Sequence, residues 1–127
     1  MKIFKTENPV YRINFVDDSD VFLAYDFTEQ ESEDFGYSIH KGKWDGNAYI
    51  YEYSCLPMSE LEDYSFDTDY SEMDEYGSRD VLTRATFRLI DQEENEIFLT
   101  LFNSHNGKNF HAFEMTQDGY KLFDGQL

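Results

Sequence analysis

The stretch from Ser59 to Tyr76 carries the densest set of side chains that could do chemistry. It holds eight carboxylates and four aromatic rings, with no lysine or arginine. Carboxylates bind cations and basic side chains, and tyrosines anchor protein–protein interfaces. The combination indicates a surface that receives a positively charged partner. Its predicted binding residues are Glu60, Glu62, Asp63, Tyr64, Asp67, Asp69, Tyr70, Glu72, Asp74, Glu75 and Tyr76.

Calcium is the first cation to consider, because Asp67, Asp69 and Ser71 occupy alternate positions. A calcium-binding EF-hand loop requires glycine at its sixth position and a bidentate glutamate at its twelfth. Those positions hold Glu72 and Ser78 here, so the template fails at both. A weak, unspecific cation site is the only metal alternative that this stretch leaves open.

Nucleophilic or metal chemistry would have to use the few histidines and the single cysteine. His105 and His111 lie six residues apart around a predicted turn, without the spacing of a metal motif. Cys55 could meet His40 or His111 only through the fold, and it has no local signature of a catalytic nucleophile. With 27 acids, close carboxylate pairs arise by chance. We therefore predict no enzyme and no cofactor, with a hydrolase that uses an unrecognised carboxylate site as the least favoured alternative.

Net charge restricts the class of partner. Ten Lys and Arg stand against 27 Asp and Glu, a formal charge of −17. Such a chain repels nucleic acid and anionic membranes and attracts basic proteins. A second acidic segment, 17–34, holds eight carboxylates and no basic residue. From this segment we add Glu29, Glu31, Glu33 and Asp34 to the predicted binding surface.

The elements that must position these residues are mostly strands. Apolar residues alternate with polar ones, and turn signals such as "DDSD", "DGN" and "NG" separate the runs. The pattern predicts an α+β, mainly β fold: an antiparallel sheet of about seven strands joined as hairpins. The predicted strands cover 10–16, 21–27, 35–44, 48–55, 80–90, 96–102, 110–115 and 120–123.

The segment 56–80 interrupts this pattern and is predicted to be a crossover with one or two short helices. Ser59 and Glu62 have the spacing of a capping box, and Gly77 could end a short helix that follows Ser71. Self-repelling acidic helices would need apolar anchors on the sheet. The candidate anchors are Leu61, Tyr64, Phe66, Tyr70 and Met73.

The organisation of the chain indicates one acidic domain over 1–127. The sequence shows no internal repeat and no linker rich in proline or glycine, and its length suits a single core. Neither a signal peptide nor an apolar run of about 18 residues is present. With one cysteine, Cys55, these features predict a soluble, cytoplasmic protein. Its oligomeric state is left open.

These observations predict a non-enzymatic inhibitor that covers a basic, nucleic-acid-handling surface on a partner protein such as a nuclease. Two versions are equally allowed: an immunity protein or antitoxin against a nuclease toxin, or a phage DNA mimic that blocks restriction or CRISPR defence. The alternative is an acidic interaction or structural module whose charge serves solubility alone. Reversal of Asp67, Asp69, Asp74 and Glu75 to lysine is expected to abolish binding without unfolding the domain.

Overall fold

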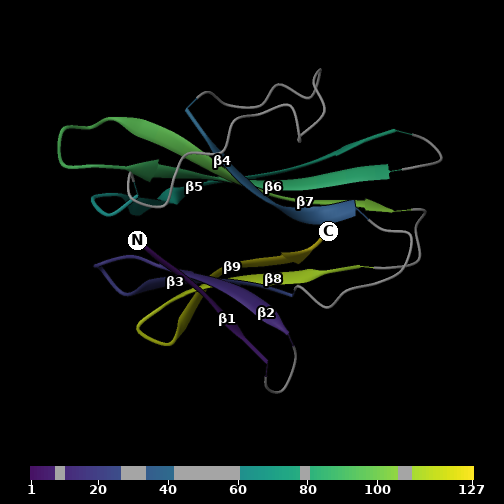
Figure 1. The fold of residues 1–127 in the computed structure, drawn as a ribbon, viewed down its shortest axis with the longest axis horizontal. Coiled ribbons are helices and arrows are strands. Elements are labelled where there is room, and N and C mark those ends of the chain that lie inside the picture. Colours follow the sequence, from purple (N-terminus) through teal and green to yellow (C-terminus); the bar gives the residue numbers. More distant parts are fainter. Residues whose placement is uncertain (8–10, 27–33, 42–60, 78–80, 106–109) are drawn as a thin grey trace.

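In the part of the chain that the structure describes, nine strands form two sheets that face each other (Figure 1). The computed structural model describes residues 1–7, 11–26, 34–41, 61–77, 81–105 and 110–127. The first sheet has the order β1-β2-β3-β8-β9, and the second has the order β4-β7-β6-β5. The strands are β1 (Lys2–Thr6), β2 (Arg12–Val16), β3 (Val21–Asp26), β4 (Asp34–His40), β5 (Ser65–Tyr76), β6 (Val81–Ile90), β7 (Glu96–His105), β8 (Ala112–Gln117) and β9 (Tyr120–Gln126).

All seven strand pairs are antiparallel, so the prediction of a mainly β, antiparallel fold is confirmed. The predicted hairpin of the first two apolar runs is β2 and β3, in which Ile13 lies opposite Tyr25. Tight turns also join β6 to β7 and β8 to β9. Each of these hairpins turns at the same end of the molecule, which brings their polar tips together (Figure 1).

The core fills the space between the two sheets and is rich in aromatic rings. Phe15, Leu23 and Tyr25 alternate with more exposed residues and are fully buried from the first sheet. Across the core, the ring of Phe87 lies edge-on to that of Phe113, with their centroids 5.9 Å apart. Burying each such side chain contributes about 1.5–3 kcal/mol before the loss of conformational entropy is counted. The aromatic composition therefore builds the core.

Two features of the predicted sheet are corrected. The described residues form nine strands in two sheets, where about seven strands in one sheet were predicted. The strand Lys2–Thr6 was missed because it is a short edge strand that buries little: Ile3 is half-buried, and Phe4 is exposed. The predicted strand 48–55 and its hairpin turn lie outside the described residues.

The predicted helix after Ser71 is wrong, because Ser65–Tyr76 form β5. Met73 lies opposite Ala85, and Phe66 lies opposite Leu89, so β5 completes the second sheet. A strand separates same-face carboxylates by about 6.8 Å, whereas a helix brings them to about 5–6 Å at one-turn spacing. An extended backbone therefore lowers the repulsion that a helix would suffer.

The predicted capping box of Ser59 and Glu62 does not begin a helix in the described residues. Leu61–Tyr64 form a turn, in which the Tyr64 amide donates to the Leu61 carbonyl at 3.2 Å, while Ser59 lies outside the described residues. No residue in the described ranges is helical. Accordingly, that part of the chain contains no helix with the length and apolar character needed to span a membrane.

Candidate functional site

Four turns lie at one end of the two sheets, at the left in Figure 1. They span residues 17–20, 61–64, 91–95 and 118–119. Each presents at least one exposed carboxylate, and no ion pair to these groups is found among the described residues. We call this surface the acidic end. It consists of Asp18, Asp20, Glu62, Asp63, Glu93, Glu94 and Asp118.

Asp17 ties the first of these turns to the second sheet. Its carboxylate is only 5 % exposed, and its Oδ1 accepts hydrogen bonds from the amides of Ser19 and Val21, both at 2.9 Å. Its Oδ2 accepts from the amide of Phe66 in β5, also at 2.9 Å. The acidic segments 17–34 and 56–80 therefore meet through this buried carboxylate.

Two further contacts attach neighbouring turns. The amino group of Met1 donates to the carbonyls of Leu61, at 2.9 Å, and Glu62, at 3.2 Å. The Nε2 of Gln117 donates to the carbonyl of Ser19 at 3.3 Å, which links the β8–β9 turn to the β2–β3 turn. These bonds hold the backbones of the turns while the outward carboxylates stay in solvent.

The β6–β7 turn is organised around Asp91. Its Oδ1 accepts from the amides of Glu93, at 2.9 Å, and Asn95, at 2.8 Å, and its Oδ2 accepts from the Asn95 side chain at 3.0 Å. The hydrogen bond from the Asn95 side chain, followed by the backbone amides, lowers the pKa of Asp91. Glu93 and Glu94 are thus displayed on a turn that one ionised carboxylate organises.

Three of the four turns place an acidic residue in the left-handed backbone region. The φ angles are 62° at Asp20, 65° at Glu94 and 52° at Asp118. Aspartate tolerates this conformation better than most residues, whereas glutamate gains nothing from a local side-chain bond. Glycine would relax the turn at Glu94, at the loss of one carboxylate. Retaining the charge costs roughly 1–2 kcal/mol of backbone strain.

The carboxylates of β5 have different surroundings from those of the turns. Asp74 receives two hydrogen bonds of 2.6 Å from Arg84, whose side chain is 1 % exposed. Arg88 contacts Glu96 at 2.6 Å and Asp67 at 3.0 Å, and the hydrogen bonds to Glu96 and then Asp67 raise its pKa. Two carboxylates predicted to bind a partner, Asp67 and Asp74, therefore bind arginines of the neighbouring strand.

The remaining described members of the predicted surface divide into two groups. Glu62 and Asp63 belong to the acidic end, and Asp69 and Glu75 are exposed on β5. Because β5 is an edge strand, exposed charge there also hinders pairing with a strand of another molecule. Three members are half-buried: Tyr64 packs against the core, Tyr70 lies 5.9 Å from the Phe98 ring centroid, and Glu72 is in the second sheet.

Two of the other predicted residues stand in strands, and four lie outside the described residues. Asp34 and Tyr76 contribute their backbones to β4 and β5. Glu29, Glu31, Glu33 and Glu60 lie outside the described residues.

Five residues of the acidic end were absent from the predicted surface: Asp18, Asp20, Glu93, Glu94 and Asp118. Asp18 and Asp20 belong to an acidic segment already noted, but Glu93, Glu94 and Asp118 stand in short turns far along the chain. The available signal was the acidic character of the hairpin tips "DDSD", "DQEEN" and "QDG". Only the sheet topology shows that these tips share one end.

The candidate catalytic and metal residues are dispersed in the described part of the chain. There, no group of three His, Cys, Asp or Glu side chains is arranged to hold a metal ion. His40 is buried in β4 with its Nε2 3.1 Å from Thr100 Oγ1, and buried His111 has its Nδ1 3.1 Å from the Asp26 carbonyl. Cys55 lies outside the described residues.

The chain was compared with known protein families, curated proteins and solved structures. No family model, curated protein or solved structure matches the chain.

Proposed function

We propose that this protein is a non-enzymatic inhibitor whose acidic end binds and blocks a basic, nucleic-acid-handling surface of a partner protein. Carboxylates would take the places that phosphates occupy on that surface. A nuclease toxin neutralised by an immunity protein or antitoxin fits this chemistry, as does a restriction or CRISPR protein blocked by a phage DNA mimic.

One observation carries the proposal: seven exposed carboxylates from four separate turns converge at one end. Two carboxylates 7 Å apart in water repel by about 0.6 kcal/mol, so gathering seven of them opposes folding. A cationic partner would relieve that repulsion. Because Asp17 and Asp91 bind the turn backbones, the neighbouring charges are already held in place, which lowers the entropy lost on binding.

Apolar anchors lie in the strand that follows the turn bearing Asp118. Tyr120 is 77 % exposed and Leu122 is 42 % exposed on β9, an edge strand. Interfaces draw much of their binding energy from a few such side chains, while surrounding charges steer the approach. Tyr120 supplies the exposed ring that half-buried Tyr64 and Tyr70 do not offer.

The test begins with affinity capture from the source cell, followed by measurement with the purified partner. The variant Asp18→Asn/Glu93→Gln/Glu94→Gln removes three charges from the acidic end. Its matched control, Glu7→Gln/Glu75→Gln/Asp124→Asn, removes three exposed charges elsewhere. We expect the native protein and the control to inhibit the partner and displace its nucleic acid. The acidic-end variant should require at least about tenfold more protein for the same inhibition.

Equal inhibition by both variants would exclude the acidic end as the binding surface. A captured partner that is acidic, or whose nucleic-acid binding continues unchanged in the complex, would contradict the inhibitor function itself. Nucleic-acid binding by the isolated chain would also contradict it.

A further inference from the structure

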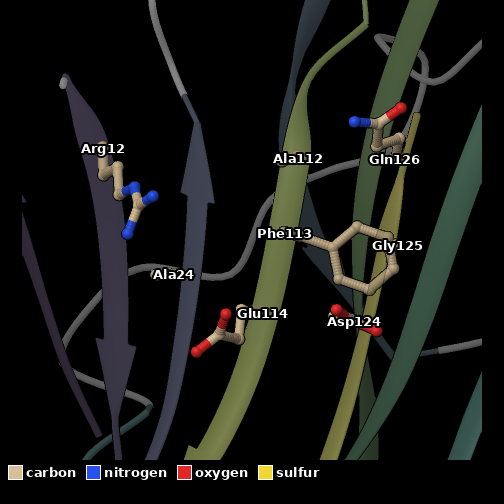
Figure 2. A pocket seen from close by; sticks show the side chains of 8 residues that line it. All are labelled: Arg12, Ala24, Ala112, Phe113, Glu114, Asp124, Gly125 and Gln126. Atoms are coloured by element: carbon tan, nitrogen blue, oxygen red, sulfur yellow. The ribbon is translucent and has the colours of Figure 1, made fainter. Parts of the chain in front are cut away.

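The outer face of the first sheet contains a hollow of about 220 Å³ (Figure 2). It spans strands β2, β3, β8 and β9, and so differs in position and in lining from the acidic end. Its lining residues are Arg12, Ala24, Ala112, Phe113, Glu114, Asp124, Gly125 and Gln126.

Small residues on two adjacent strands create the hollow. Ala24 and Ala112 stand on β3 and β8, where larger side chains would fill the space. A Cβ atom on Gly125 would lie 2.9 Å from the ring of Phe113 and 3.1 Å from the sulfur of Met73. Glycine at this position therefore lets the buried Phe113 ring close the floor beneath β9.

Opposite charges stand on the two sides of this floor. Figure 2 shows the guanidinium of Arg12 and the carboxylate of Glu114 both turned toward β3, the strand between them. Glu114 lies directly opposite Ala24 in the sheet, and Arg12 lies directly opposite Asp26, the next outward-facing residue of β3. Glu114 therefore stands beside the methyl group of Ala24, and Arg12 stands diagonally across from it.

Both side chains are exposed to solvent, and each has an opposite charge nearby: Asp26 lies opposite Arg12 in the sheet, and the charge of Glu114 acts on Lys121. No ion pair or hydrogen bond to the Arg12 or Glu114 side chain is found among the described residues, whereas Arg84 and Arg88 both bind carboxylates. The second acid of the hollow, Asp124, is already 3.2 Å from Lys121, and this contact, followed by the charge of Glu114, raises the pKa of Lys121. Glu114 is thus the carboxylate available to a cationic group in the hollow.

We propose that the hollow binds a zwitterion of amino-acid size. Its carboxylate would receive hydrogen bonds from Arg12, its ammonium would donate to Glu114, and its carbon chain would cover Ala24 and Ala112. Pockets that enclose drug-sized ligands measure roughly 300–1,000 Å³, so this smaller, open hollow suits a small metabolite. Requiring both charges at once would reject simple carboxylates and simple amines.

The test is an NMR titration of the native protein with L-norvaline, against two probes that each lack one charge. Pentanoate has the same carbon chain without the ammonium, and butylamine lacks the carboxylate. We expect saturable shifts at the Ala24 and Ala112 methyl groups and the Gly125 amide. The dissociation constant should lie near or below about 1 mM. Either single-charge probe should bind at least about tenfold more weakly.

Three variants locate the site. Arg12→Gln and Glu114→Gln should each weaken norvaline binding at least about tenfold, and Ala24→Leu should fill the hollow and prevent binding. Lys2→Gln, which removes an exposed charge of β1 outside the lining, should keep binding within about twofold. If Ala24→Leu fails to fold, the two exposed charge variants decide the outcome.

The proposal is overturned if norvaline gives no saturable shift at a concentration roughly ten times the expected dissociation constant. Equal binding of pentanoate or butylamine, or full binding by Arg12→Gln and Glu114→Gln, would overturn it as well. None of these results bears on the acidic end, because the hollow does not contain its residues.

Discussion

Both β5 and the turns of the acidic end are rich in carboxylates, but the surroundings of these carboxylates differ. On β5, Asp67 and Asp74 bind arginines that β6 presents from the neighbouring strand. At the acidic end, Asp18, Glu93 and Glu94 extend into solvent from hairpin tips, without ion pairs in the described structure. The first group holds the sheet together, and the second leaves its charge available to another molecule.

The density of charge along a sequence therefore does not identify which charges are available for binding. Cross-strand register decides it, because Asp74 lies directly opposite Arg84. Reversal of Asp67 and Asp74 to lysine, together with Asp69 and Glu75, would therefore place lysines against Arg84 and Arg88 and damage the fold. Loss of binding in that variant would say nothing about a surface.

Among the substitutions considered, that of Asp74 should have the largest effect on the free energy of unfolding. Asp74→Ala leaves the fully buried Arg84 guanidinium without its bidentate partner, and we expect the free energy of unfolding to fall by about 3 kcal/mol. Urea denaturation measures this loss. The neighbouring exposed substitution Glu75→Ala should change stability by less than about 0.5 kcal/mol. A similarly small loss for Asp74→Ala would refute the structural role of the ion pair.

Substitution of Asp17 should give the next largest effect. Asp17→Ala removes an acceptor shared by three backbone amides, two within its own turn and one from β5. We expect a loss of about 2 kcal/mol, because buried donors are left without a partner. Asp18→Ala serves as the control in the same thermal or urea unfolding measurement. Equal stability of the two variants would contradict the division between structural and exposed carboxylates.

Acidification should loosen the β6–β7 turn. The folded pKa of Asp91 lies below its ordinary value of 3.8, so its ionised form is favoured by folding. This contribution is complete well above pH 3.8 and disappears as the pH falls through the lower folded pKa. The protection of the Glu93 and Asn95 amides from exchange, relative to the intrinsic rate at each pH, should fall over that range in the native protein. In Asp91→Ala, which has no acceptor, the protection should already be lost at neutral pH, and unchanged protection would count against the turn mechanism.

Removal of charge at the acidic end should have the smallest effect on stability, and it should stabilise the protein where the other substitutions destabilise it. Asp18→Asn/Glu93→Gln/Glu94→Gln should raise the free energy of unfolding by less than about 0.5 kcal/mol per site at low salt. Added salt should erase the gain, because these groups are exposed and screened. Destabilisation measured by urea unfolding at low salt would show that the three carboxylates have structural partners.

Sequence patterns predicted the local strands more readily than their assembly. Alternation around Ile13 and Phe15, with the acidic turn that follows, was sufficient to predict the β2–β3 hairpin. The strand Ser65–Tyr76 was missed because short-range capping signals such as Ser71 and Gly77 suggested a helix. The arginines that stabilise the extended form are brought alongside only by the sheet.

The position of the acidic end was predictable only in part. The composition predicted a surface rich in carboxylates, and Glu62 and Asp63 of that predicted surface are in the acidic end. Glu93, Glu94 and Asp118 could not be added, because their proximity depends on which hairpins turn at the same end. Two of the predicted tyrosines, Tyr64 and Tyr70, are half-buried because their rings meet apolar neighbours, as Tyr70 does beside Phe98.

The rate of association with the captured partner is the most direct test of whether the acidic end binds that partner. At low salt, the variant Asp18→Asn/Glu93→Gln/Glu94→Gln should associate roughly tenfold more slowly than the native protein, since steering by local charge is lost. The control Glu7→Gln/Glu75→Gln/Asp124→Asn carries the same net charge and should stay within about threefold of the native rate. Equal slowing of both variants would mean that total charge, and not the acidic end, brings the partner to the protein.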